Sequence, residues 1–255
     1  MLVRSWNLFN GNTSPPQRHG FLDEMIRLAT EDDPDVVCVQ EVPAWALDRF
    51  AAGAVAARPK AGTALGRLIT ALDHGLIRSA LAGQGNAFWI AARLRVVEQH
   101  VLVLNPRRFR AREAARLGLP LATRLAWAKE RRIVQAVRLA TGEGTVVVAN
   151  THCTSYAGDD RIAEAELLRA AWFAESFARR GEPLVLAGDF NLRQGSVLDA
   201  LAGEEWGFST PGPGIDHVLV RGAPAGDLRV WPDERRRRPD GRLLSDHAPV
   251  EVEIG

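Results

Sequence analysis

The chain has 255 residues, of which 46% are hydrophobic and 25% charged, so it can bury a sizeable core and we expect a single domain over residues 1–255. The formal net charge of +1 excludes the strong overall positive field of a dedicated nucleic-acid-binding protein. The two cysteines, Cys38 and Cys153, lie in or beside apolar runs and are expected to be core thiols, which excludes a disulfide framework.

The start of the chain leads directly into an apolar run that ends at Trp6-Asn7. The charged leader, apolar segment and cleavage site of a secretory signal have no room ahead of it. No apolar stretch is long enough to cross a bilayer. We therefore expect a cytoplasmic protein with no integral membrane segment, and no sequence feature points to an obligate protein partner.

Short apolar runs rich in β-branched or aromatic residues predict ten strands, near residues 2–7, 35–40, 86–92, 95–104, 133–139, 145–151, 183–188, 215–220, 227–231 and 249–254. Helical spacing of apolar residues predicts helices over about 18–31, 159–180 and 194–201. The Arg-rich segment 106–132 is also expected to be helical. The segment 51–85 is expected to carry a helix that packs on the core.

The order of these elements predicts mixed sheets. The helix over 159–180 joins two strands in a βαβ-like unit, which requires the strands to be parallel. The paired runs over 86–104 and 133–151 are close in the chain and predict antiparallel hairpins or meanders.

Polar clusters follow the carboxyl ends of several predicted strands, where a rigid sheet can hold side chains over a common cleft. The clusters are Trp6-Asn7, Gln40-Glu41, Asn150-Thr151-His152, Gly188-Asp189-Phe190-Asn191, Ile215-Asp216-His217 and, just before the last strand, Asp246-His247. Each cluster taken singly is compatible with a solvated strand end, an Asx turn or a structural histidine. Their joint order favours metal-assisted hydrolysis of a phosphate ester.

The ordered motifs resemble those of the endonuclease/exonuclease/phosphatase superfamily, which includes pancreatic-type deoxyribonuclease, exonuclease III-type repair nucleases, neutral sphingomyelinases and inositol polyphosphate 5-phosphatases. The matching stretches are Ser5-Trp6-Asn7, Val39-Gln40-Glu41, Gly85-Asn86-Ala87, Asn150-Thr151-His152, Ala187-Gly188-Asp189-Phe190-Asn191, Gly214-Ile215-Asp216-His217-Val218 and Ser245-Asp246-His247-Ala248-Pro249-Val250. The resemblance covers essentially the whole chain. It implies an α/β (α+β) four-layer sandwich of two packed mixed β-sheets flanked by helices, with the active site at one sheet edge.

The resemblance also implies a divalent cofactor, Mg²⁺ or Mn²⁺, which would neutralise phosphate charge and polarise the phosphoryl group. Glu41 is the first choice of metal ligand, with Asn7 beside it and Asp246 as a further ligand of the same site. His247 is expected to be the general acid/base, because an imidazole titrates near working pH, and Asp216 is expected to orient it.

Three further site residues are expected to act on the phosphate, the attacking water or the leaving group. By the same resemblance, Asp189 positions the attacking water or handles the leaving-group proton, while Asn191 and His152 donate hydrogen bonds to phosphate oxygens. No Ser, Cys or Lys is obviously activated as a covalent nucleophile, so direct attack by water is favoured. His152 stands where repair nucleases usually carry Tyr, which disfavours abasic-site repair.

The sequence defines the substrate less closely than it defines the catalytic residues. Arg108 and Arg236, from two Arg-rich stretches, are candidate substrate-binding residues, although both stretches also fit solvated surface. We expect a phosphodiester, in a nucleic acid or in a small molecule or lipid. The alternatives are a phosphomonoesterase of the same fold and a catalytically silent binding scaffold.

Overall fold

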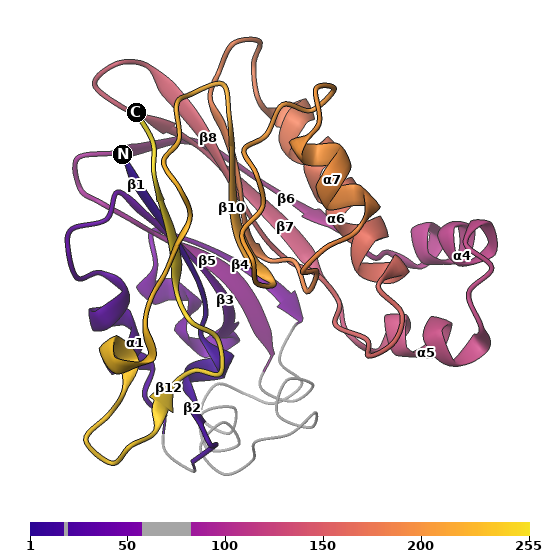
Figure 1. Ribbon diagram of the computed structural model, residues 1–255, viewed down its shortest axis with the longest axis horizontal. Helices are drawn as coiled ribbons and strands as arrows, with labels where there is room; N and C mark the ends of the chain where they lie inside the picture. Colours follow the sequence, from indigo (N-terminus) through magenta and orange to yellow (C-terminus); the bar gives the residue numbers. More distant parts are fainter. Residues whose placement is uncertain (18–19, 58–82) are drawn as a thin grey trace.

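Two β-sheets pack face to face and helices cover their outer faces (Figure 1). The computed structural model describes residues 1–17, 20–57 and 83–255. Both sheets mix parallel and antiparallel pairs, which confirms the predicted four-layer sandwich. Valines and small residues from both inner faces form the core between the sheets, as alternation along each strand requires.

The first sheet has the strand order β11-β13-β1-β3-β5-β4. Its strands are β1 (Leu2–Asn7), β3 (Val36–Pro43), β4 (Ala52–Ala57), β5 (Gln84–Ile90), β11 (Arg229–Val230) and β13 (Val250–Glu253). β1 and β3 are parallel, and α1 (Leu22–Ala29) connects them. The apolar face of α1 packs on the outer face of this sheet, against Trp6, Val37 and Val39.

The second sheet has the order β10-β9-β8-β7-β6. Its strands are β6 (Arg95–Val103), β7 (Ile133–Ala140), β8 (Thr145–His152), β9 (Leu184–Asp189) and β10 (Asp216–Arg221). β8 and β9 are parallel and joined by α6 (Arg161–Phe177), so the predicted βαβ unit is confirmed. α6 and α7 (Ser196–Ala202) cover the outer face of this sheet.

Three smaller features belong to the described part of the fold. α4 (Arg107–Arg116) and α5 (Leu121–Lys129) form a helical hairpin that projects from the sandwich between β6 and β7 (Figure 1). The short strands β2 (Thr13–Ser14) and β12 (Leu243–Leu244) pair with each other, and 3₁₀ turns occupy Phe9–Gly11, Ala44–Arg49 and Asp233–Arg236.

The predicted elements agree with the structure except at some boundaries, whereas the strands β2, β4 and β12 were not predicted. The predicted helix over 18–31 is the shorter α1, and residues 18 and 19 lie outside the described residues. The helix expected within 51–85 falls mostly on residues 58–82, which also lie outside them, and the described start of this segment is the strand β4. Within the described parts of the chain, no helix combines the length and apolar character needed to cross a bilayer.

A buried ion pair joins the first strand to the last. The Arg4 guanidinium donates from Nε and Nη2 to Glu251 Oε2, at 2.9 and 2.7 Å, and from Nη1 to the carbonyl oxygens of Ala29 and Glu31. Trp231 Nε1 donates to the same carboxylate oxygen at 3.0 Å. The ion pair therefore links β1 to its neighbour β13, and the bonds to the Ala29 and Glu31 carbonyl groups hold the end of α1 against β1.

Glu251→Gln is expected to lower the free energy of unfolding by about 3 kcal/mol, because it leaves the buried Arg4 charge uncompensated. Urea unfolding followed by circular dichroism measures the change. Glu253→Gln is the matched control on the same strand, since the Glu253 side chain is 68% exposed, and it is expected to change stability by less than about 0.5 kcal/mol. Equal effects of the two variants would contradict the role of the pair.

Candidate active site

Strand register brings the predicted site residues to one edge of the sandwich. The parallel pair β1 and β3 ends with Asn7 opposite Gln40, and the parallel pair β8 and β9 ends with His152 opposite Asp189. β10 runs antiparallel to β9 and begins there, with Asp216 opposite Asp189. Carboxyl ends of parallel strands meet at the same edge, which is why residues from distant parts of the chain converge.

The loop that carries His247 is fastened to this edge. Trp6 Nε1 donates to the His247 carbonyl oxygen at 2.8 Å, and the backbone N–H of Ser245 donates to the carbonyl of Asn12 at 2.9 Å. Ser245 Oγ donates to the Asn7 carbonyl at 2.6 Å and accepts from the His247 N–H at 3.1 Å. The final loop is therefore held directly over the end of β1.

His247 and Asp216 form a hydrogen-bonded pair. His247 Nδ1 lies 2.7 Å from Asp216 Oδ2, and Nε2 faces Asp189 Oδ2 at 3.8 Å. Burial lowers the pKa of His247, but the Asp216 hydrogen bond and the charges of Asp216, Asp189 and Asp246 outweigh it and raise the pKa to about 10. The carboxylate thus fixes the ring and leaves Nε2 directed at the cluster.

Asp189 is a buried carboxylate at the centre of the site, 1% exposed. Asn7 Nδ2 donates to its Oδ2 at 2.9 Å, and the backbone N–H of Asn191 donates to its Oδ1 at 3.0 Å. Burial, followed by the charge of Asp216, raises the pKa of Asp189 to about 7. Two amide donors therefore hold a carboxylate whose charge is only partly compensated.

Glu41 lies at a bulge in β3 with a backbone φ of +53°. Asn10 Nδ2 donates to its Oε2 at 2.7 Å, and its Oε1 lies 3.9 Å from His152 Nε2. Burial raises the pKa of Glu41, and the neighbouring charge of Asp246 raises it further. β-Bulges often redirect a side chain beside an active site, and residues with a strained left-handed backbone cluster at functional sites. The conformation of Glu41 is therefore typical of a functional residue.

His152 lies between a cation and the carboxylates. Its Nδ1 is 3.0 Å from Arg132 Nη1, and its Nε2 is 3.4 Å from Asp189 Oδ2. Burial, together with the charges of Arg132 and His247, lowers the pKa of His152 well below its ordinary value. The pKa of His152 is therefore shifted in the direction opposite to that of His247.

Comparisons with known proteins identify the family of this chain. Residues 5–247 match the sequence profile described as the Endonuclease/Exonuclease/phosphatase family. The chain belongs to this family. It is therefore a hydrolase that acts on phosphate esters, in a family whose members generally depend on a divalent metal. No curated protein matches the sequence significantly.

Solved structures share the fold at low sequence identity. A humanized D. rerio TDP2 with 14 mutations has a TM-score of 0.64 at 13% identity, covering 100% of this chain and 98% of that one. A functionally unknown conserved protein from Enterococcus faecalis V583 has a TM-score of 0.64 at 16% identity, with 100% and 99% covered. The mannosyl-6-phosphatase Bt3783 of Bacteroides thetaiotaomicron VPI-5482 has a TM-score of 0.59 at 17% identity, again with 100% and 99% covered.

The donor set of this family member fits a hard divalent cation. Glu41 and Asp189 both lie within 4 Å of His152 Nε2, and burial raises the pKa of each, so added positive charge would stabilise the cluster. Asp189, Asp216 and His247 also offer atoms within 4.8 Å of one another. In that group Asp216 Oδ2 is engaged with His247 Nδ1, and Mg²⁺ prefers oxygen ligands, so the oxygen donors around Glu41 suit a hard ion better.

Two of the other site residues from the family motifs have defined local contacts. Asn191 has a φ of +53°, and its Nδ2 donates to the Cys153 carbonyl at 2.9 Å. The Asp246 side chain is 44% exposed, and its Oδ1 lies 3.9 Å from His247 Nε2. Both residues lie at the edge where the site forms, and their roles stay predictions.

The two candidate substrate arginines lie in different environments. Arg108 is exposed on α4, in the projecting hairpin. Arg236 is 6% exposed, and its Nη1 donates to the carbonyl oxygens of Leu244 and Ser245 while its Nη2 bonds Asp233. Substrate binding by either arginine stays a prediction, and the contacts of Arg236 favour support of the loop that carries His247.

Several residues that build the site had no individual role predicted from the sequence. Asn10 contacts Glu41, and Arg132 contacts His152. Other polar residues stand near each of them in the sequence, so no local pattern singled them out. Gln40 and Asn150 link the two sheets beneath the site, with Gln40 Nε2 donating to Asn150 Oδ1 at 2.8 Å. Asn150 Nδ2 donates in turn to the carbonyl oxygens of Val39 and Ala87, at 3.0 Å each. Gln40 and Asn150 did lie in recognised motifs, which was the available signal.

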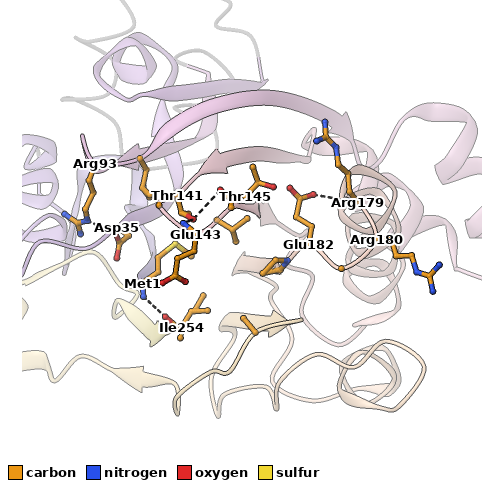
Figure 2. Close-up of a pocket in the computed structure, with 18 residues that line it drawn as sticks. Met1, Asp35, Arg93, Thr141, Glu143, Thr145, Arg179, Arg180, Glu182 and Ile254 are labelled. Carbon is orange, nitrogen blue, oxygen red and sulfur yellow. Dashed lines mark hydrogen bonds and ion pairs between the residues drawn. The ribbon is translucent and has the colours of Figure 1, made fainter.

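A cavity of about 930 Å³ lies at the other end of the strands (Figure 2). Met1, at the start of β1, and Thr145, at the start of β8, are among its lining residues, and no predicted site residue lines it. Arg93 is paired there with Asp35 at 2.7 Å. The cavity is therefore separate from the catalytic edge.

Ser245→Ala is expected to lower the free energy of unfolding by about 1–3 kcal/mol, because the buried Asn7 carbonyl and His247 N–H lose their shared partner. Chemical denaturation measures the difference. Ser176→Ala serves as the control, since that hydroxyl is exposed on α6, and little change is expected. A Ser245→Ala protein as stable as the wild type would show that the hydroxyl does not hold the loop.

Proposed function

We propose that this chain hydrolyses phosphodiesters with the help of Mg²⁺ or Mn²⁺ by direct attack of water. The hydrogen-bonded pair of His247 and Asp216, with Nε2 directed at Asp189, carries the proposal. Such a pair moves a proton at one nitrogen while the carboxylate holds the other. All residues of the set are present, which argues against a silent scaffold.

Each residue then has a distinct task. His247 exchanges a proton through Nε2, and Asp216 fixes the ring and stabilises its charge. Asp189 orients the attacking water or handles the leaving-group proton. His152 and Asn191 donate hydrogen bonds to phosphate oxygens, where negative charge develops.

Glu41, Asn7 and Asp246 would hold the metal ion. When bound, the ion supplies positive charge that neutralises the phosphate and offsets the carboxylates that raise the pKa of His247. Asn7 presents its amide nitrogen to Asp189 and its oxygen to the backbone N–H of Phe9 at 3.0 Å. This arrangement suits a weaker or water-mediated contact with the ion.

A polyanionic substrate is supported by the distribution of charge. Residues 106–132 contain nine basic and two acidic residues, although the whole chain has a net charge of only +1. Arg108 is exposed on this hairpin, whose base reaches the active site at Arg132. One similar structure is D. rerio TDP2 complexed with a single-strand DNA product, at 13% identity and a TM-score of 0.62. A nucleic acid is therefore the first substrate to test.

Phosphomonoester hydrolysis is the second candidate, favoured by the similar fold of the mannosyl-6-phosphatase. We also propose action in the cytoplasm without an obligate protein partner. The two cysteines, both buried free thiols, support a reducing compartment.

The test is an assay of the purified chain with Mg²⁺ or Mn²⁺ against plasmid DNA, RNA, a bis-aryl phosphodiester and an aryl phosphomonoester. Turnover of nucleic acid supports a nuclease, and turnover of the small diester alone restricts the substrate to small molecules or lipids. Exclusive turnover of the monoester would overturn the proposal in favour of a phosphatase. Inactivity on all four with both metals would favour a scaffold.

His247→Ala is expected to reduce kcat by about 10²–10⁴-fold, because proton transfer to or from the reacting group is lost. Asp216→Asn should also reduce kcat, since the ring loses the anion that orients it. Steady-state kinetics on the best substrate of the panel measure both. His100→Ala, at an exposed histidine on β6, is the control and should retain activity. Normal turnover by His247→Ala would remove this residue from the mechanism.

Glu41→Gln is expected to raise the Mg²⁺ concentration needed for half-maximal activity, because the ligand loses its charge. It should also reduce the rise in melting temperature that Mg²⁺ gives by binding the folded chain. Glu143→Gln, exposed at the far cavity, is the matched control. A metal titration unchanged by Glu41→Gln would show that the ligand assignment is wrong.

A further inference from the structure

The two imidazoles of the site present the same ring atom to opposite charges. His247 Nδ1 faces the Asp216 carboxylate at 2.7 Å, whereas His152 Nδ1 faces the Arg132 guanidinium at 3.0 Å. A carboxylate accepts a hydrogen bond, so Nδ1 of His247 carries a proton. A guanidinium only donates, so Nδ1 of His152 must be the acceptor, and the ring proton resides on Nε2.

Arg132 is firmly held at this place. It is 6% exposed, and its Nη2 forms an ion pair with Glu130 Oε2 at 2.6 Å. Its backbone N–H donates to Asn105 Oδ1 at 3.0 Å, and its carbonyl accepts from the Leu104 N–H at 2.8 Å. These contacts lock the residue between the end of α5 and the start of β7. The guanidinium is thus an organised donor.

The opposite side of the His152 ring faces the reaction centre. Nε2 lies 3.4 Å from Asp189 Oδ2 and 3.9 Å from Glu41 Oε1. A proton fixed on Nε2 therefore points at the carboxylate cluster, where the phosphate of a substrate would be held. With Nδ1 occupied by Arg132, the ring has no second nitrogen free to relay a proton.

We propose that Arg132 is a positioning residue that fixes His152 in the Nε2–H tautomer. His152 then serves as a permanent hydrogen-bond donor to the substrate phosphate, and proton exchange is left to His247. The donor role rests on the proposed function, whereas the tautomer is a property of the free protein and can be tested without substrate.

The first test is NMR spectroscopy of the full chain, labelled with ¹⁵N in its six histidines and free of divalent ions. A His152→Gln variant assigns the signals. Long-range ¹H–¹⁵N correlations are expected to show a protonated Nε2 and an unprotonated Nδ1 for His152 in the wild-type chain. A proton on Nδ1, or a mixture of the two tautomers, would overturn the proposal.

The second test replaces the guanidinium. Arg132→Met should populate both His152 tautomers and reduce kcat by about 10–100-fold with a smaller change in KM, since outer partners of site histidines typically act on this scale. Arg132→Lys retains a donor-only cation and should restore the wild-type tautomer and part of kcat. Arg95→Met, at an exposed arginine on β6 outside the Arg-rich segment, is the control and should leave the His152 tautomer and kcat unchanged.

The outcomes separate the two proposals. If Arg132→Met loses activity but keeps the wild-type tautomer, Arg132 acts in another way and the positioning role is overturned. If Arg132→Met does not fold, the wild-type spectrum and Arg132→Lys still decide the tautomer. If the wild-type chain hydrolyses none of the four test substrates, the proposed function fails, but the NMR result stands by itself.

Discussion

The accumulation of negative charge at one sheet edge is the constraint on which the rest of this structure depends. Glu41, Asp189, Asp216 and Asp246 gather there, and burial raises the pKa of Glu41 and of Asp189. Like charges in a buried site destabilise the folded chain unless donors or a cation compensate them. A site of this kind lowers the stability of the folded chain but attracts positive charge. Attraction for a cation is the property that metal-assisted hydrolysis of a phosphate ester requires.

The surrounding fold supplies part of this compensation with neutral donors. Asn7 and the backbone of Asn191 bind Asp189, and Asn10 binds Glu41. Amide donors stabilise a carboxylate without cancelling its charge, so the site keeps its attraction for a cation. Beneath them Asn150, on β8 of the second sheet, donates to buried carbonyl groups of β3 and β5 in the first sheet, which fixes the relative position of the strands that carry the donors.

The sandwich also explains why two histidines with the same chemistry behave differently. Asp216, the first residue of β10, contacts the ring of His247. Arg132, the residue just before β7, contacts the ring of His152. The pKa of His247 is raised and that of His152 lowered, in each case with a contribution from the charge of the partner. Environments that push the pKa values of neighbouring groups apart are a usual means of dividing acid, base and donor roles.

The sequence by itself determined most of the strands, the βαβ unit and the convergence of the polar clusters, because these follow from local periodicity and from the position of motifs at strand ends. The strand β4 and the two short strands β2 and β12 were not predicted. The tertiary structure alone decided the partners. Arg132 and Arg236 looked like members of Arg-rich surface stretches, yet one is buried against His152 and the other against the loop of Ser245. Asn10 likewise gained its role only by contact with Glu41. Burial and pairing between residues far apart in the chain depend on how the sheets pack, and no local pattern records them.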